Sequence, residues 1–185
     1  MSMDRSTLPR NARRWIDRCV PDQDPIPSQI VNTQEGEIDV RGKWMVFKAR
    51  TVYDREPFAF RWRANVRIMA GVWAVAEDGH DGNTGWGGSK MWGIVPMSGR
   101  KGPEVFRMQF VRSLAELVWM PQFVLSLPDL TWSDSGDTTF DVRATVAGQE
   151  SVVSFELDGE GEITRATSTR PYDITGGFAE TPWRC

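Results

Sequence analysis

The strongest constraint on the fold is a run of alternating side chains between Phe58 and Ile68. Successive side chains of a β-strand point to opposite faces, so alternation over this length predicts a strand with one apolar face and one solvent-facing face. Sheets with one solvent-exposed face are commonly antiparallel. We therefore expect buried side chains to alternate with more exposed ones: Phe60 and Trp62 should be buried, and Arg61 and Arg63 should be more exposed.

Residues 1–20 are predicted to form an N-terminal helix. Ser6 or Thr7 is the expected cap, Pro9 fits the first turn, and Pro21 ends the helix. One helical face is apolar, which also predicts a buried, inert Cys19: Leu8, Ala12, Trp15, Ile16, Cys19 and Val20. Basic residues cluster here and favour a solvated helix face over a nucleic-acid-binding arm: Arg5, Arg10, Arg13, Arg14 and Arg18.

The remaining chain predicts strands over residues 30–97, a second helix over 103–120, strands over 130–170 and an irregular tail over 171–185. Strands, a helix and more strands joined by short turns indicate an α+β fold that is mainly antiparallel β. We expect one curved sheet of about seven to nine strands, covered by the long central helix.

Length and composition are typical of one globular domain over residues 1–185. The formal net charge of −3 gives no general attraction to nucleic acid or anionic lipid, and no nucleic-acid partner is expected. The sequence has no stretch long and apolar enough for a transmembrane segment and no signal-peptide pattern, so the expected location is the cytoplasm. Two cysteines make no disulfide framework.

The single histidine, His80, lies in the segment Asp78-Gly79-His80-Asp81-Gly82-Asn83. These residues could donate oxygen and imidazole ligands to a metal, but their order does not match a calcium loop. We interpret the segment as a turn and expect no metal and no cofactor.

The glycine-rich segment Gly85-Trp86-Gly87-Gly88 lacks the lysine and the following helix of a phosphate-binding loop. We interpret it as a flexible hairpin at the rim of the sheet, with Trp86 where a ligand would enter.

Several short segments resemble a group of uncharacterised bacterial proteins known as a domain of unknown function. The resemblance runs from about Trp15 to Trp183 and rests on Val20-Pro21 with Pro25-Ile26-Pro27, Phe60-Arg61-Trp62-Arg63-Ala64, Gly102-Pro103-Glu104, Ala115-Glu116-Leu117-Val118-Trp119-Met120-Pro121 and Thr181-Pro182-Trp183. More distantly, a Phe-Arg-Trp strand before an Asp-Gly turn resembles the half-barrel of periplasmic (Lol-type) lipoprotein carriers. That resemblance implies a half-barrel and a lipid or another hydrophobic ligand.

Three functions remain open. The leading hypothesis is a non-enzymatic binding module with an apolar wall and polar groups at its mouth: Trp44, Phe58, Phe60, Trp62 and Val66 for the wall, and Trp86, Arg112 and Glu116 for the mouth. The second is a small enzyme that uses Glu116, His80 and an aspartate as acid and base, although Glu116 also fits an exposed ion pair with Arg112. The third is a structural or interaction protein without a ligand.

Overall fold

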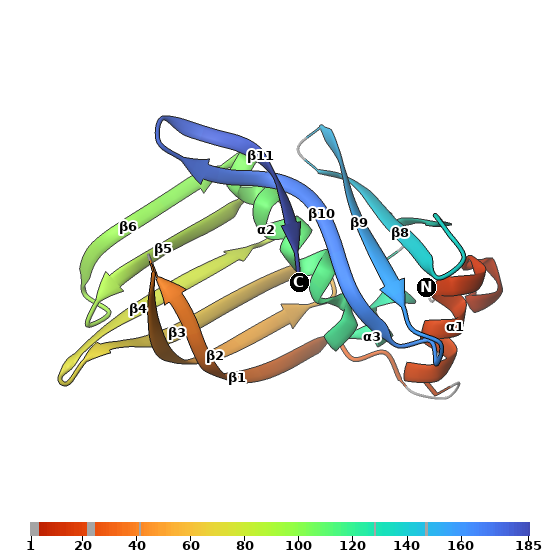
Figure 1. Ribbon diagram of the computed structural model, residues 1–185, viewed down its shortest axis with the longest axis horizontal. Coiled ribbons are helices and arrows are strands. Elements are labelled where there is room, and N and C mark those ends of the chain that lie inside the picture. The colour runs from red at the N-terminus through yellow and green to blue at the C-terminus, as the bar shows by residue number, and fades with distance from the viewer. Residues whose placement is uncertain (1–3, 22–24, 41, 128, 147) are drawn as a thin grey trace. The chain divides into compact units, whose positions relative to one another are not determined.

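The computed structural model describes residues 4–21, 25–40, 42–127, 129–146 and 148–185, which divide into two compact units. One unit contains residues 29–109, and the other contains residues 1–28 and 110–185. Within the described residues, eleven strands form two antiparallel sheets (Figure 1). The mainly antiparallel β class is confirmed, whereas the prediction of one continuous sheet is wrong.

The unit of residues 29–109 contains a six-stranded meander. Its strands pair in chain order: β1 (Gln29–Val40), β2 (Lys43–Asp54), β3 (Ala59–Met69), β4 (Val72–His80), β5 (Gly85–Met91) and β6 (Val95–Gly102). Because each strand pairs with the next through a short turn, the register is local and β1 and β6 are the two edges.

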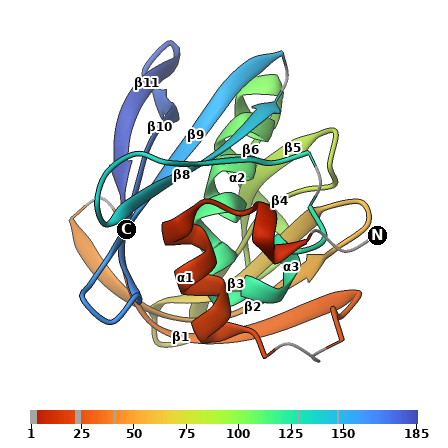
Figure 2. The same ribbon diagram turned by 90° about the vertical axis from the view of Figure 1, so that its right-hand side faces the viewer.

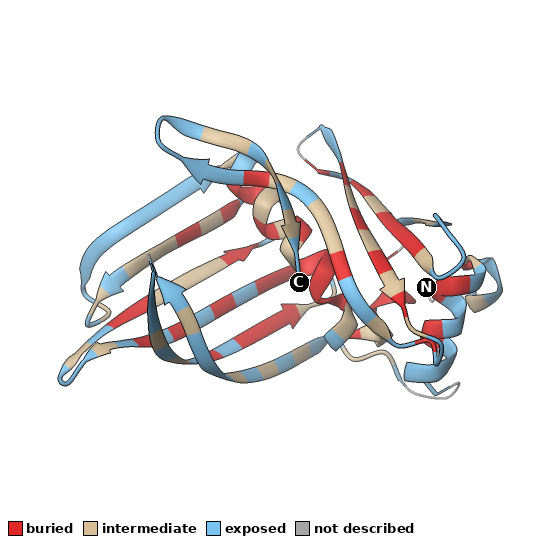
Figure 3. Cartoon of the chain, viewed as in Figure 1, coloured by how far each residue is buried: buried red, intermediate tan, exposed pale blue. Residues whose placement is uncertain are grey.

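The alternation predicted for β3 is confirmed (Figure 3). Phe60 and Trp62 are buried, while Arg61 and Arg63 are exposed. We call the side of the sheet that carries Phe60 the apolar face and the side that carries Arg61 the charged face. The charged face is tied by cross-strand ion pairs from Arg61 to Asp54 and from Arg63 to Glu77.

Helix α2 (Pro103–Ala115) begins against the first residue of β5. A Cβ on Gly85 would lie 2.3 Å from Cα of Phe106, so the start of the helix fits only above a glycine. The segment Gly85–Gly88 therefore belongs to an internal strand, and its interpretation as a flexible hairpin is wrong.

The other unit contains a five-stranded sheet of order β11-β10-β9-β8-β7. Its strands are β7 (Thr131–Asp134), β8 (Thr139–Val146), β9 (Gln149–Leu157), β10 (Ile163–Ile174) and β11 (Gly177–Arg184). Helix α1 (Arg10–Cys19) packs on this sheet (Figure 2), where the ring of Trp15 stacks on Phe140 and Phe155 at centroid distances of 5.9 and 6.4 Å.

The N-terminal helix starts later than predicted and has a different cap. A short 3-10 turn, η1 (Arg5–Thr7), precedes it, and Pro9 rather than Ser6 or Thr7 is the cap residue. The backbone N–H of Asn11 donates instead to Asp134 at 3.0 Å, so a distant strand satisfies the helix end. Cys19 is exposed, which corrects the predicted buried thiol, because it lies at the edge of the apolar stripe.

The arginines of the N-terminal segment bind loops of the same unit. Arg14 donates to the carbonyl oxygen of Gly159, and Arg18 forms an ion pair with Glu162 at 2.5 Å. Arg10 donates to the carbonyl oxygen of Asp137 at 3.0 Å.

The helix predicted for residues 103–120 is present as α2 followed by the 3-10 turn η2 (Glu116–Trp119), and α3 (Pro121–Val124) comes after it. Three polar residues of this segment, Gln109, Ser113 and Glu116, are all buried. The described part of this helix is thus enclosed on its polar side as well as on its apolar side.

The irregular tail predicted for residues 171–185 is wrong, since it contains the end of β10 and all of β11. Both prolines of this segment lie where one side of the strand has no pairing partner. Pro171 lies beyond Ser168, the last residue of β10 paired with β9, and Pro182 is on the edge strand β11.

Candidate functional site

The apolar face begins with a closed aromatic row beside the start of α2. Register places Tyr53, Phe60 and His80 side by side on β2, β3 and β4. The ring of His80 contacts Phe58, Phe60 and Phe106 edge-on at centroid distances of 5.3–5.7 Å. Phe60 and His80 are fully buried, so this row is a packed layer.

His80 is therefore part of this core. Burial lowers the pKa of its imidazole to about 3, although the neighbouring Asp81 carboxylate acts in the opposite direction. Its Nδ1 accepts a hydrogen bond from the backbone N–H of Gly82 at 3.3 Å. Of the predicted turn, only the part after β4 is a turn, because Asp78 and His80 lie within that strand. A neutral, enclosed imidazole has no access to a substrate proton at neutral pH.

Next to the aromatic row lies a second row, Thr51, Trp62, Asp78 and Gly87, which we call the polar row because it contains polar atoms beside the indole ring. Trp62 pairs with Thr51 on β2 and with Asp78 on β4, and Asp78 pairs with Gly87 on β5. The indole Nε1–H of Trp62 donates to Oε1 of Gln34 at 3.0 Å, which fixes the plane of the ring.

Two buried polar atoms of this region have no hydrogen-bond partner within the described residues: Oγ1 of Thr51, which pairs with Trp62, and Oε1 of Gln109. Both side chains are nearly inaccessible, at 0% and 3% exposure. A Cβ on Gly87 would lie 3.5 Å from Nε2 of Gln109, so the helix side chain reaches the polar row. Buried polar groups usually have partners, and an unpaired one costs about 1–3 kcal/mol.

Beyond the polar row, small residues allow two large rings to meet. Ala49 and Ala64 pair across β2 and β3 and are both buried. The rings of Phe47 and Trp62, which lie on either side of this pair along the strands, approach to 6.2 Å between centroids. We call Phe47, Trp62, Ala49 and Ala64 the aromatic floor.

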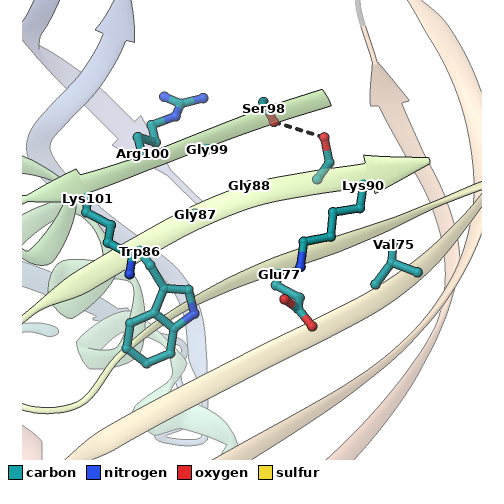
Figure 4. A pocket seen from close by; sticks show the side chains of 11 residues that line it. Val75, Glu77, Trp86, Gly87, Gly88, Lys90, Ser98, Gly99, Arg100 and Lys101 are labelled. Atoms are coloured by element: carbon teal, nitrogen blue, oxygen red, sulfur yellow. Dashed lines mark hydrogen bonds between the residues drawn. The ribbon is translucent and has the colours of Figure 1, made fainter. Parts of the chain in front are cut away.

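The other two predicted tryptophans lie on the opposite side of the sheet. Trp44 is in register with the exposed positions of β2 and is 67% exposed, so its assignment to the same wall as Phe60 is wrong. Trp86 is also on the charged face, where it lines a hollow of about 620 Å³ (Figure 4). In Figure 4, Trp86 and Lys101 lie on one side of β5 and β6, whereas Arg100 points to the other side.

Arg112 and Glu116 belong to the other unit and form an ion pair of 2.8 Å between Nε and Oε1. The side chains are only 20% and 11% exposed, so the pair is half-buried rather than an exposed helix pair. Glu116 thus has a fixed electrostatic partner on its own helix.

Phe58, Phe60 and Trp62 were predicted from the sequence as site residues. Thr51, Gln34, Phe47 and Gln109 were not. Thr51, Gln34 and Phe47 lie on strands whose alternation is weaker, and Gln109 is a polar residue of the helix, for which no local pattern indicates burial. Alternation within β2 carries the only local indication, since odd-numbered residues from Phe47 to Tyr53 share a face.

Within the described residues, no three His, Cys, Asp or Glu side chains are arranged to hold a metal ion. No helix in the described residues is both long enough and apolar enough to cross a bilayer.

No curated protein and no solved structure matches this chain. A family profile does match, and it spans residues 1–185. The match agrees with the resemblance to a domain of unknown function, while the likeness to lipoprotein carriers stays a prediction. The chain belongs to DUF6544, a family of unknown function.

Proposed function

We propose that this protein is a binding module that holds an apolar or amphipathic small molecule, such as an acyl chain, against the apolar face of β1–β6. The observation that carries the proposal is the presence of two buried, unpartnered polar atoms at the polar row: Oγ1 of Thr51 beside the aromatic floor, and Oε1 of Gln109 near Gly87 on β5. Ligand sites of this type combine an apolar wall with a few placed polar groups.

The aromatic floor is suited to this role because it is held in place before any ligand arrives. Gln34 fixes the indole of Trp62, and Phe47 packs against its ring. A fixed wall lowers the ordering cost of binding. A ligand hydroxyl or carboxyl group would satisfy the oxygen of Thr51 or Gln109, while the apolar body covers the rings. Phe58 and Phe60 support the floor from the neighbouring row.

Titration with a long-chain fatty acid, followed by tryptophan fluorescence, tests the proposal. Wild-type protein should bind saturably, and native mass spectrometry of protein purified from cells should detect a bound lipid. Thr51→Val preserves shape and removes the hydroxyl, so it should weaken binding roughly 3- to 10-fold, the value of one hydrogen bond. Trp44→Phe, on the charged face, is the matched control and should change only the background fluorescence.

Two results would contradict the proposed ligand binding. If Thr51→Val raises the free energy of unfolding and leaves fatty-acid binding unchanged, the hydroxyl is only an unpaired group in the core. If no saturable binding occurs with wild-type protein, the apolar face is a structural layer and the proposal fails.

A further inference from the structure

The largest concentration of exposed apolar side chains lies at one end of the six-stranded sheet. The turns of the β1–β2, β3–β4 and β5–β6 hairpins all lie at this end (Figure 1). Eight large exposed side chains gather on these turns and the adjoining strand ends, and we call them the hairpin tip: Val40, Trp44, Met69, Trp73, Trp92, Ile94, Val95 and Met97.

The hairpin tip is not a set of loose loops. The backbone N–H of Trp92 donates to the carbonyl oxygen of Trp73 at 2.9 Å. Its indole Nε1–H donates to the carbonyl oxygen of Gly71 at 3.2 Å. These bonds join the β5–β6 turn to the β3–β4 turn. The next two backbone N–H groups, of Gly93 and Ile94, also donate within the turn.

Trp92 occupies an unfavourable backbone conformation for its residue type. Its φ is 52°, and among the described residues it is the one position outside glycine with a positive φ. With Gly93 at 74°, the pair has the positive φ angles of a type I′ turn, where Asn-Gly is the preferred pair. A bulky ring at this position adds strain, yet it remains 46% exposed and gains little burial in return.

Charge at this end differs in sign from that of the whole chain. The formal net charge is −3, but among the described residues the strand ends around the hairpin tip carry three cations, Lys43, Arg67 and Lys90, and one carboxylate, Asp39. None of the three cations forms an ion pair with another described residue. Asp39 accepts the backbone N–H of Gly42 at 2.6 Å.

We infer that the hairpin tip docks on the surface of an anionic lipid bilayer. Tryptophan favours the interface between water and lipid, and aliphatic side chains beside it reach the acyl region. The three cations would face the headgroups, each with about 1 kcal/mol of attraction near an anionic surface. Since the N–H groups of the β5–β6 turn are bonded internally, that turn can enter the headgroup layer without orphaned donors.

Co-sedimentation with vesicles tests the inference. Wild-type protein should partition onto vesicles of phosphatidylcholine mixed with phosphatidylglycerol, with a blue shift of tryptophan emission, and more weakly onto phosphatidylcholine alone or at high salt. Trp92→Asn should lower the partition coefficient about tenfold or more, because it removes a large apolar ring from the contact. The same variant suits the turn better than tryptophan does, so its folding stability should be unchanged or higher.

Two controls show whether the effect on vesicle binding is specific to the hairpin tip. Trp119→Gln changes an exposed tryptophan that lies outside the hairpin tip and should leave the partition coefficient unchanged. Fatty-acid binding on the apolar face should also be unchanged in Trp92→Asn, so failure of the proposed ligand function and failure of membrane docking are distinguishable.

Three results would overturn the inference: no partition of the wild-type protein, equal partition of Trp92→Asn, or vesicle binding lost equally in Trp119→Gln. A self-associated wild-type protein that becomes monomeric in Trp92→Asn, without any vesicle binding, would assign the hairpin tip to a second copy of the chain instead.

Discussion

At the scale of single residues, burial decides the chemistry of His80. The sequence places it among aspartates and glycines, which suggests an exposed turn or metal ligand. Its side chain instead lies between aromatic rings, because it shares the apolar face of β4 with Phe60 of β3. One step along the strand separates a core position from an exposed one. The composition of the neighbouring sequence does not specify which of the two positions a residue takes.

His80 should make the protein less stable in mild acid. Its folded-state pKa of about 3 lies below the ordinary value of 6.5, so the unfolded chain binds the proton first as pH falls. Stability is fully present above about pH 6.5 and is lost progressively down to about pH 3. Urea unfolding of wild-type protein should therefore show a loss of about 2 kcal/mol from this residue between about pH 7 and about pH 5.

His80→Phe fits the aromatic surroundings and cannot titrate, so it should remove this dependence. Asp81 offers the control, because hydrogen bonds from Thr84 and Asn83 lower the pKa of its carboxyl from 3.8 to about 2. Stability from Asp81 is present above about pH 3.8 and is lost as pH falls through about 2, so above about pH 4 the loss of stability reports His80 and not Asp81. Equal pH dependence of wild-type protein and His80→Phe above about pH 4 would show that the imidazole is hydrated.

At the scale of elements, two paired strands give a matched test of packing. Gly85→Ala places a methyl group 2.3 Å from the backbone of Phe106, and neither β5 nor α2 can shift without breaking other contacts. We expect a loss of about 2–3 kcal/mol in urea unfolding. Gly99→Ala on β6 meets nothing within 4 Å, so its stability should change by less than about 0.5 kcal/mol. Equal stability of the two variants would mean that α2 does not begin on β5.

The same elements show what sequence patterns can and cannot specify. Alternation in β3 predicted its faces correctly, because period two is a property of the strand itself. The sequence predicted a helix over residues 103–120 but not the burial of Gln109 and Ser113, since that burial depends on segments distant in the chain. Trp44 was predicted to belong to the wall with Trp62, and Trp86 to the mouth, although the registers of β2 and β5 place both on the charged face. The number of sheets is likewise a matter of strand partners, which local pattern does not encode.

At the scale of the whole molecule, the chain divides into two compact units, and a single domain over residues 1–185 stays a prediction. The boundary falls between Gln109 and Phe110, inside the continuous helix α2. Neither unit can unfold alone without breaking this helix or leaving half of it without its packing partners. A short isolated helix is marginal in water, so its two halves depend on the surrounding contacts.

We therefore expect residues 1–185 to unfold as one cooperative domain. Calorimetry should show a single transition with equal calorimetric and van't Hoff enthalpies. Gly85→Ala perturbs one unit, and Phe140→Leu perturbs the other, where Phe140 is fully buried against Trp15. Each should lower the midpoint temperature of the same transition, because each should reduce the free energy of unfolding by roughly 1–3 kcal/mol. Two resolved transitions, each moved by only one of these variants, would show instead that the two sheets are separate folding units joined by a helix that frays at its centre.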